Sequence, residues 1–163
     1  MTDHVHIRPA VEADVPLIHE FIRELAQYER LLDQVVATED DLRTTLFGPR
    51  PYAEVLIAES RGRALGFALF FHNYSTFLGR PGLYLEDLFV RADARGQGIG
   101  RRLLSAVAAV AVARGCGRLD WAVLNWNEPA IGFYRRMGAV MQEDWRVFRL
   151  TGEALARVAR EHT

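Results

Sequence analysis

The stretch RADARGQGIGRRL, residues 91–103, places three glycines within five positions and then continues into an apolar helical pattern. A glycine inside a helix costs about 0.5–1 kcal/mol relative to alanine, so helix stability does not favour Gly96, Gly98 or Gly100. The preceding residues, LYLEDLFVR (83–91), have the composition of a strand. Where a strand leads through glycines into a helix, free N–H groups and the helix dipole can bind a phosphate. The loop is therefore a candidate phosphate site, although a plain strand-to-helix turn would also explain it.

Two familiar phosphate-binding motifs do not match this loop. It contains no Gly-Lys-Ser/Thr, which argues against a nucleotide-hydrolysing loop. Its spacing is G-x-G-x-G rather than the G-x-G-x-x-G of dinucleotide-binding folds, and it lies past the middle of the chain. Arg95, Arg101 and Arg102 nevertheless flank the glycines with positive charge.

The composition narrows the class of protein. The chain has 163 residues, of which 50% are hydrophobic, and this suits one globular domain spanning residues 1–163. We expect no membrane span and no signal peptide, because no apolar run of about 18 residues and no basic-then-apolar start occurs. Cys116 is the only cysteine, which excludes an internal disulfide and fits the cytoplasm. A net charge of −1 argues against nucleic-acid binding.

The pattern of apolar residues predicts an α/β fold without repeats or linkers. Hairpin strands and a strand-helix-strand crossover both occur, so we expect a mixed, mostly antiparallel sheet flanked by helices. Thr38 is the expected N-cap of the second helix, and Gly138 the expected stop of a later one. The expected strands are residues 4–8, 52–60, 64–74, 83–91, 117–124, 139–142 and 145–150, and the expected helices are residues 13–32, 38–47, 98–114 and 127–137 and a last one from residue 151.

Two motifs together resemble a known family. Arg95-x-x-Gly98-x-Gly100 after an apolar strand is similar to the acetyl-CoA pyrophosphate signature of the GNAT acetyltransferases. NWNEPAIGFYRRMGA (125–139) resembles their second signature, an Asn-x-x-Ala-x-x-x-Tyr helix closed by glycine. The order of the other elements agrees, so the resemblance covers nearly the whole chain. It implies the GNAT acyl-CoA N-acyltransferase fold, acetyl-CoA as cofactor and a homodimer.

Within that family the chain is most similar to the diamine (spermidine/spermine and thialysine) acetyltransferases. The matching pieces are IRPA, ELAQYE, TEDDL, LYLEDLFV, RGQGIG and WNEPAIGFYRRMGA. Two segments depart from those enzymes: the loop after RGR (61–63) and the segment AVMQEDWRVF (139–148) are both shorter. Because the second region helps to shape the amine site, the resemblance transfers the fold and cofactor better than the substrate.

The resemblance also implies a set of cofactor contacts. Leu88, Phe89 and Val90 would offer backbone groups to the thioester and pantetheine, although their side chains suit a core equally well. The remaining cofactor-binding residues would be Arg95, Gly96, Gln97, Gly98, Ile99, Gly100, Arg101, Asn127, Pro129, Ala130 and Tyr134.

Acetyl transfer to an amine needs a base for the ammonium and an acid for the leaving thiolate. Tyr134 lies seven residues after Asn127, so both project from nearly the same side of a helix. The resemblance implies that Tyr134 is the catalytic acid, whereas spacing alone favours a core aromatic in a stripe with Phe133 and Met137. The resemblance also implies that Glu86 is the base, acting through water.

Adjacent carboxylates in the middle of a strand are unusual. Glu86 and Asp87 should face opposite sides, so at least one would be covered and have a raised pKa. Alternatively, one is exposed and the other bonds to the backbone. The resemblance implies that the amine is bound by Tyr28, Glu29, Glu86 and Asp87, and Asp120 and Trp121 are weaker candidates. The acidic residues around Glu29 would attract a polycation, or they form only a solvated face.

These observations predict an enzyme that transfers an acetyl group directly from acetyl-CoA to a primary amine. The acceptor would be a small diamine, a polyamine or a thialysine-like amine. The alternatives are a protein N-terminus, an amino acid or an antibiotic as acceptor, or a non-catalytic acetyl-CoA sensor. His4 and His6 share a strand face but have no third ligand nearby in sequence, so we expect no metal. Cys116 has no evident base, which disfavours an acyl-cysteine step.

Overall fold

The computed structural model describes residues 4–162 and contains a mixed sheet with strand order β1-β2-β3-β4-β5. The strands are β1 (His6–Pro9), β2 (Glu54–Ser60), β3 (Arg63–Ser75), β4 (Arg80–Val90) and β5 (Leu119–Trp121). The first three pairings are antiparallel, and β5 runs parallel to β4. The expected mixed, mostly antiparallel sheet is therefore confirmed. β5 is shorter than the strand expected over residues 117–124.

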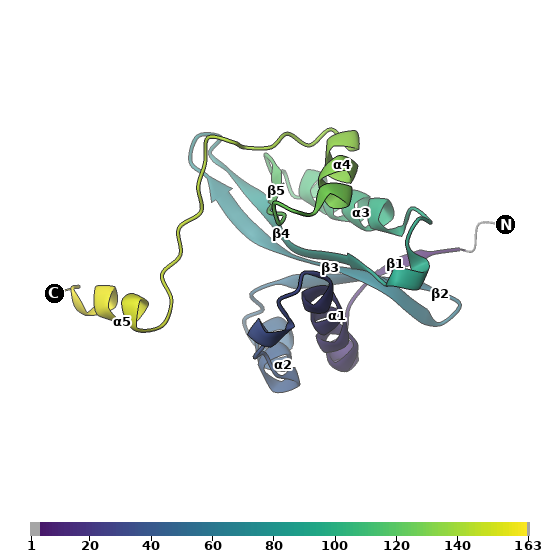
Figure 1. The fold of residues 1–163 in the computed structure, drawn as a ribbon, viewed down its shortest axis with the longest axis horizontal. Coiled ribbons are helices and arrows are strands. Elements are labelled where there is room, and N and C mark those ends of the chain that lie inside the picture. Colours follow the sequence, from purple (N-terminus) through teal and green to yellow (C-terminus); the bar gives the residue numbers. More distant parts are fainter. Residues whose placement is uncertain (1–3, 163) are drawn as a thin grey trace. The chain divides into compact units, whose positions relative to one another are not determined.

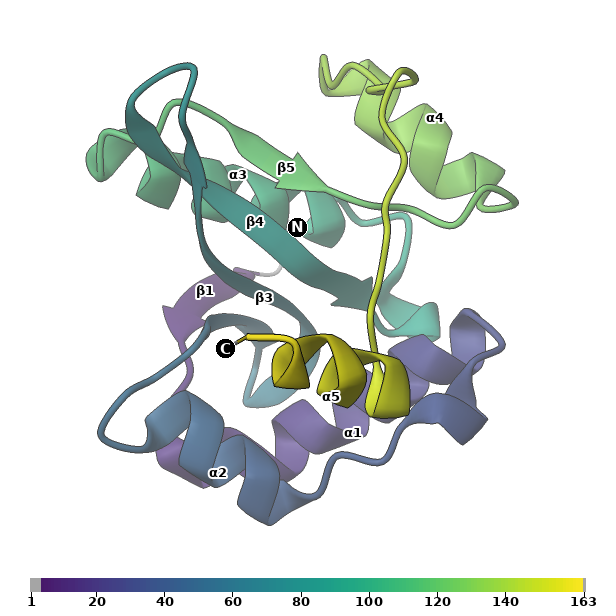
Figure 2. The ribbon, with the colours of Figure 1, turned by 90° about the vertical axis from the view of Figure 1, so that its left-hand side faces the viewer.

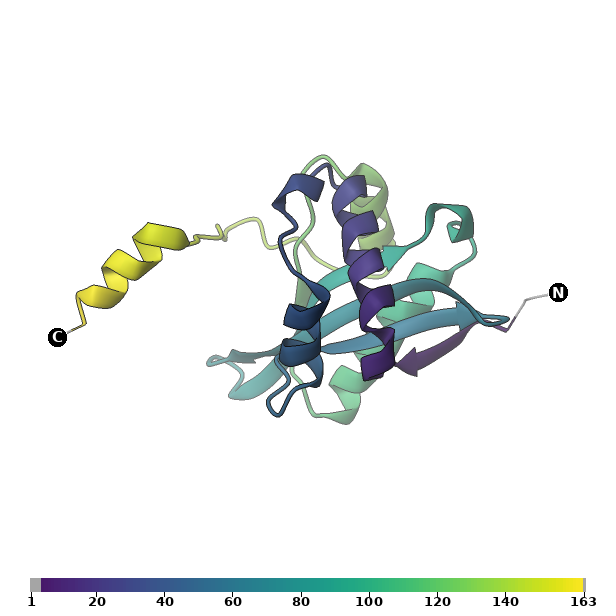
Figure 3. The same ribbon diagram turned by 90° about the horizontal axis from the view of Figure 1, so that it is seen from below.

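Helices cover both faces of this sheet (Figures 1, 2 and 3). On one face lie α1 (Val15–Tyr28) and α2 (Glu39–Phe47), and on the other lies α3 (Ile99–Ala113). Short 3-10 turns precede each of these helices: Glu12–Asp14 before α1, Leu32–Gln34 before α2 and Ala92–Ala94 before α3. Thr38 caps α2 as expected, because its hydroxyl accepts from the Asp41 N–H at 3.1 Å and the Asp41 carboxylate accepts from the Thr38 N–H at 2.8 Å.

The core between α1, α2 and the sheet is built from aromatic and branched residues. The Phe21 ring of α1 stacks on Phe67 of β3 with 5.2 Å between the centroids, and Phe89 of β4 meets Phe21 edge-on. Phe89 lies in this core, so its side chain agrees with the structural reading left open by the sequence. The buried members of this core are Val15, Ile18, Phe21, Leu42, Leu46, Val55, Ile57, Phe67, Leu69 and Phe89.

The chain divides into two compact units, one ending at Leu124 and the other beginning at Asn125. The second unit contains α4 (Glu128–Arg136) and α5 (Gly152–Arg160). The strands expected at residues 139–142 and 145–150 are wrong for this structure, because residues 137–151 contain neither helix nor strand. Alternating apolar residues suit a strand, but a strand also requires a partner for its backbone hydrogen bonds. Within residues 4–162, no helix combines the length and the apolar character that a membrane crossing needs.

Candidate active site

A β-bulge in β4 sets the direction of the two adjacent carboxylates. Leu69 of β3 pairs with Asp87, whereas its neighbour Phe70 pairs with Leu85, so Glu86 is an extra residue in β4. A register shift of one residue exchanges the faces of a strand. Asp87 is the cross-strand neighbour of Leu69, so both side chains lie on the face of the sheet that α1 covers. The bulge places Glu86 on this same face. The expected alternation of these two carboxylates is therefore wrong, and the bulge is the reason.

Three carboxyl groups share this face, and we call Glu29, Glu86 and Asp87 the acidic cluster. Glu29 is the C-cap residue of α1. Burial raises the pKa of Glu29, and the charge of Glu86 raises it further. Burial raises the pKa of Asp87 to about 7, with further contributions from Glu86 and Glu29. The cluster thus brings negative charges together in a partly desolvated environment, where a bound cation would reduce the repulsion between the carboxylates.

Two aromatic or acidic groups from neighbouring elements border the acidic cluster. Tyr84 of β4 pairs with Asp120 of β5, and its pKa is raised by burial and then by the charges of Glu86 and Asp120. Asp120 forms an ion pair with Arg118 at 3.0 Å. Trp121 pairs with Leu85, so alternation directs it to the opposite face from Asp120. Asp120 therefore lies on the side of the acidic cluster, and Trp121 does not.

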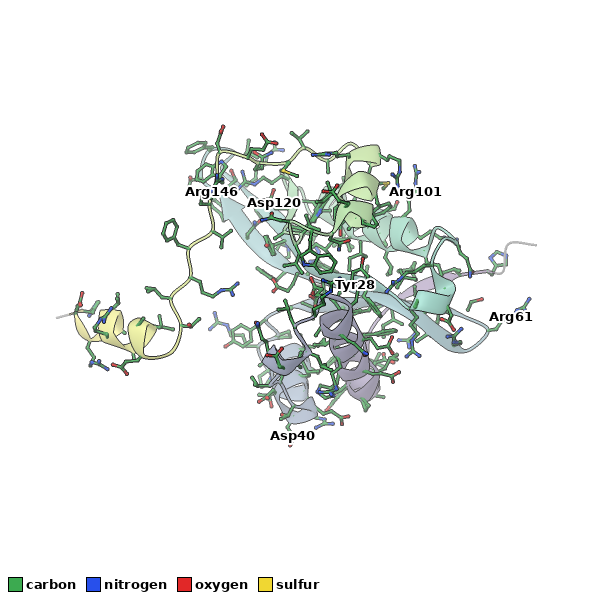
Figure 4. All side chains as sticks on the ribbon, in the orientation of Figure 1. Tyr28, Asp40, Arg61, Arg101, Asp120 and Arg146 are labelled. Carbon is green, nitrogen blue, oxygen red and sulfur yellow. The ribbon has the colours of Figure 1, made fainter. Side chains whose placement is uncertain are left out.

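Tyr28 lies in the last turn of α1, directly before Glu29 (Figure 4). Its ring is 4.7 Å from the guanidinium carbon of Arg95, the first residue of the glycine loop. Residues expected at the amine site and at the cofactor site are therefore in contact. Nothing in the sequence signalled this contact, since 66 positions separate the two residues.

The backbone angles of the glycine loop explain why glycines occur in it. Gly96 and Gly98 have φ angles of +78° and +76°, a region that other L-residues rarely adopt. Gly98 is the N-cap of α3, and a Cβ atom at Gly96 or Gly98 would meet no heavy atom within 4 Å. A Cβ at Gly100 would lie 3.7 Å from a Val90 methyl group, an ordinary packing distance. The open helix start beside Arg95 and Arg101 fits a pyrophosphate.

The other expected cofactor residues in this unit differ in exposure. Gln97 and Arg101 are exposed beside the loop, and Figure 4 labels Arg101 near the start of α3. Ile99 is 1% exposed and anchors α3 in the core, so only its backbone is available to a ligand. Leu88 and Val90 are partly buried in β4, where the Val90 carbonyl accepts a hydrogen bond from Arg95 Nε at 2.9 Å.

The second signature forms a capped helix. Asn127 is buried, and its side-chain oxygen accepts from the Ala130 N–H at 3.4 Å, with Pro129 in the first turn of α4. Gly138 ends α4 as expected, with a φ of +90° and the two hydrogen bonds of a Schellman motif: Gly138 N–H to Arg135 and Ala139 N–H to Tyr134. Tyr134 is partly buried, with its ring 5.4 Å from that of Phe133.

The open mixed sheet and the glycine loop that starts α3 agree with the acyltransferase fold that the motifs predict. The sequence pattern described as "Acetyltransferase (GNAT) family" matches residues 18–139. The chain therefore belongs to the GNAT acetyltransferase family, and the resemblance seen in its motifs is confirmed. It is an enzyme that transfers an acetyl group to a small amine.

Characterised relatives cover almost the whole chain. A thialysine N-epsilon-acetyltransferase of Bos taurus is 42% identical over 166 residues, covering 95% of this chain and 97% of the relative. An L-ornithine N5-acetyltransferase of Arabidopsis thaliana is 37% identical over 197 residues, covering 93% and 86%. Among solved structures, an integron cassette protein from V. cholerae superposes with a TM-score of 0.80 at 29% identity, covering 96% of this chain and 98% of that one.

Proposed function

We propose that the acceptor is a small diamine, a polyamine or a thialysine-like amine, and that acetyl-CoA is the donor in a direct transfer. The observation that carries this proposal is the acidic cluster, in which Glu29 and Asp87 both have raised pKa values. The named substrates of the two relatives, thialysine and L-ornithine, each carry a second amino group. One amino group reacts in its neutral form, while the other stays positive and binds to carboxylates.

The proposed roles of the residues follow from their chemistry. Acetyl-CoA supplies the acetyl group as a thioester, and the open start of α3 receives its pyrophosphate. Glu86, exposed on the bulge, accepts the proton of the reacting amine through water. Asp87, with a pKa of about 7, holds the cationic end of the acceptor together with Glu29. Tyr134 donates its phenolic proton to the leaving thiolate.

A series of amines tests the acceptor. We expect kcat/KM for linear diamines, polyamines, thialysine and lysine to exceed that for neutral-bodied monoamines about tenfold. A pair of charges 4 Å apart attracts by about 4 kcal/mol at an effective dielectric of 20, and desolvation offsets most of that. Glu29→Gln should flatten the series. Glu39→Gln, which removes an exposed carboxylate in the first turn of α2, should leave it unchanged.

Two results of this series would overturn the acceptor proposal. One is an equal kcat/KM for diamines and monoamines that Glu29→Gln does not alter. The other is a preference for a peptide N-terminus or an aminoglycoside over every diamine. Either result would leave the acetyltransferase activity itself intact.

The role of Tyr134 has its own test. Tyr134→Phe keeps the ring and its contact with Phe133 but removes the proton, so turnover should fall roughly 10²-fold or more while acetyl-CoA binding persists. Stopped-flow turnover and calorimetry of acetyl-CoA binding measure the two quantities separately. Wild-type turnover in this variant would reduce Tyr134 to a packing residue.

We also propose that the enzyme is a single-domain, cytoplasmic homodimer that binds neither nucleic acid nor membrane. Its one cysteine, Cys116, is a free thiol, which is compatible with a reducing compartment. The near-balance of charge gives no basic excess for nucleic acid. Support for the dimer comes from the exposed apolar side chains of the second unit: Val140, Met141, Trp145, Val147, Phe148, Leu150, Leu155 and Val158.

A further inference from the structure

The side chain of Arg95 is directed at α1 by three contacts. Its Nε donates to the carbonyl of Val90 at 2.9 Å. The guanidinium carbon lies 4.7 Å from the centroid of the Tyr28 ring and 5.5 Å from that of Phe89. Each ring is within the range of a cation–π interaction. Arg95 thus connects two elements: it contacts β4 at the Val90 carbonyl and the Phe89 ring, and it contacts the last turn of α1 at the Tyr28 ring.

The contacts of α1 with the core end shortly before Tyr28. Phe21 is the last fully buried member of the helix in the core, Leu25 packs against the core while partly buried, and Ala26 is the last buried residue of the helix. Tyr28, at 36% exposure, comes after all three. A contact that fixes the Tyr28 ring therefore fixes the end of the helix where the core no longer does.

The turn also transmits this position to Glu29. The Leu31 N–H bonds to the Ala26 carbonyl at 2.8 Å and the Arg30 N–H to the Gln27 carbonyl at 3.1 Å, which is a Schellman motif. The Glu29 N–H bonds to the Leu25 carbonyl at 2.9 Å, so Tyr28 and Glu29 belong to one hydrogen-bonded turn. Burial raises the pKa of Glu29 and the charge of Glu86 raises it further, so these two carboxyl groups lie near each other.

We propose that Arg95 is a positioning residue for the acceptor amine. It clamps Tyr28 and so holds Glu29 beside Glu86 and Asp87. The glycine loop and the acidic cluster are then linked through one side chain, and Arg95 acts on amine affinity as well as on the cofactor. This inference rests on the proposed binding of the acceptor at the acidic cluster.

A double-mutant cycle tests the clamp with the best primary-amine substrate of the wild type. Arg95→Gln and Tyr28→Leu should each raise the KM for the amine about threefold to fivefold, the size expected for an exposed cation–π contact. The double variant should be no worse than the worse single variant, because both remove the same contact. Tyr28→Phe keeps the ring, so it should raise the amine KM less than Tyr28→Leu does. Arg95→Lys keeps a cation and should raise the amine KM less than Arg95→Gln does.

The cofactor side of the cycle separates a clamp from a pure phosphate ligand. Tyr28→Leu should leave the calorimetric Kd of acetyl-CoA unchanged. Arg101→Gln removes the same charge from the same loop, and its effect should fall on the acetyl-CoA Kd alone. The amine KM of Arg101→Gln combined with Tyr28→Leu should therefore equal that of Tyr28→Leu. The clamp is overturned if Arg95→Gln changes only the acetyl-CoA Kd, or if its effect on amine KM multiplies with that of Tyr28→Leu.

Failure of the clamp and failure of the proposed acceptor give different results. A wrong acceptor shows as an amine series that Glu29→Gln does not alter in otherwise wild-type protein. A wrong clamp shows as independent effects of Arg95 and Tyr28, whichever amine is used.

Discussion

At the scale of single residues, the fold disfavours the charged form of Asp87 and of Glu29, because burial raises the pKa of both. Asp87 pairs in register with the apolar Leu69, and Glu86 and Glu29 add two further negative charges. A carboxyl group in such surroundings holds its proton more tightly in the folded chain than in the unfolded chain. A cationic amine would supply the missing opposite charge. The cost of this site to the free protein should therefore be measurable as a dependence of stability on pH.

We predict that Asp87→Asn raises the free energy of unfolding at pH 8 by on the order of 4 kcal/mol. The pKa of Asp87 is raised from 3.8 to about 7 in the fold, so the folded state binds the extra proton between these values. The Asp87 carboxyl group therefore does not destabilise the wild-type fold near pH 4. Its destabilising effect grows as the pH rises and is complete above about pH 7. Urea unfolding of both proteins from pH 4 to 8 measures this divergence.

Carboxyl groups with lowered pKa values do not mimic this effect. Arg8 lowers the pKa of Asp14, and Arg114 lowers that of Glu54, so their stabilisation is lost only as the pH falls below the ordinary carboxyl range. Asp33→Asn, an exposed carboxylate outside the acidic cluster, is the matched control and should parallel the wild type. Parallel curves for Asp87→Asn as well would show that Asp87 is not desolvated.

Among the elements, the start of α3 shows why glycines interrupt a good helical sequence. Gly98 is left-handed at the N-cap, and the space beyond its α-carbon is open. The backbone conformation therefore favours glycine there, and the open space leaves the first N–H groups of the helix accessible to an anion. Gly100 differs, because it has no such angle and a methyl group would fit against Val90.

A pair of substitutions at Gly98 separates backbone strain from charge. Asp and Asn tolerate the left-handed region best among non-glycine residues and both cap helices, so each variant should fold. We predict that Gly98→Asp weakens acetyl-CoA binding at least tenfold, or about 1.4 kcal/mol, relative to Gly98→Asn. Calorimetry with acetyl-CoA measures both. Equal affinities would mean that no phosphate lies near this N-cap.

The elements also show how far sequence reasoning reaches in this chain. Helices α2, α3 and α4, the hairpin strands and the stop at Gly138 follow from local rules of capping, periodicity and turn chemistry. The bulge at Glu86 could not be foreseen, because it depends on the register between β3 and β4. The contact of Arg95 with Tyr28 is a product of tertiary packing and is equally invisible. The strands expected within residues 139–150 had the right pattern but find no partner strand in one copy.

At the scale of the whole molecule, the second unit presents an unusual surface for a single chain. The segment between α4 and α5, where Figure 4 labels Arg146, includes Trp145, Val147 and Phe148 at 74%, 87% and 95% exposure. Isolated exposed apolar residues are common, whereas several of them close together in one segment indicate an interface. In the proposed homodimer, a second copy of the chain would cover this apolar segment.

We predict that the wild type is a dimer in light scattering at micromolar concentration and that Phe148→Asp is a monomer. A carboxylate placed in an apolar interface loses its hydration without gaining a partner, which costs several kcal/mol. Val36→Asp makes the same kind of change at an 87% exposed position of the first unit and should remain a dimer. A wild type that stays monomeric, or a Phe148→Asp variant that stays dimeric, would exclude this segment as the interface. A monomeric wild type whose free energy of unfolding falls on Phe148→Asp would mean that the segment packs on its own chain in solution. A dimeric wild type and a monomeric variant, with equal free energies of unfolding for the two monomers, would mean that the segment serves only dimer assembly.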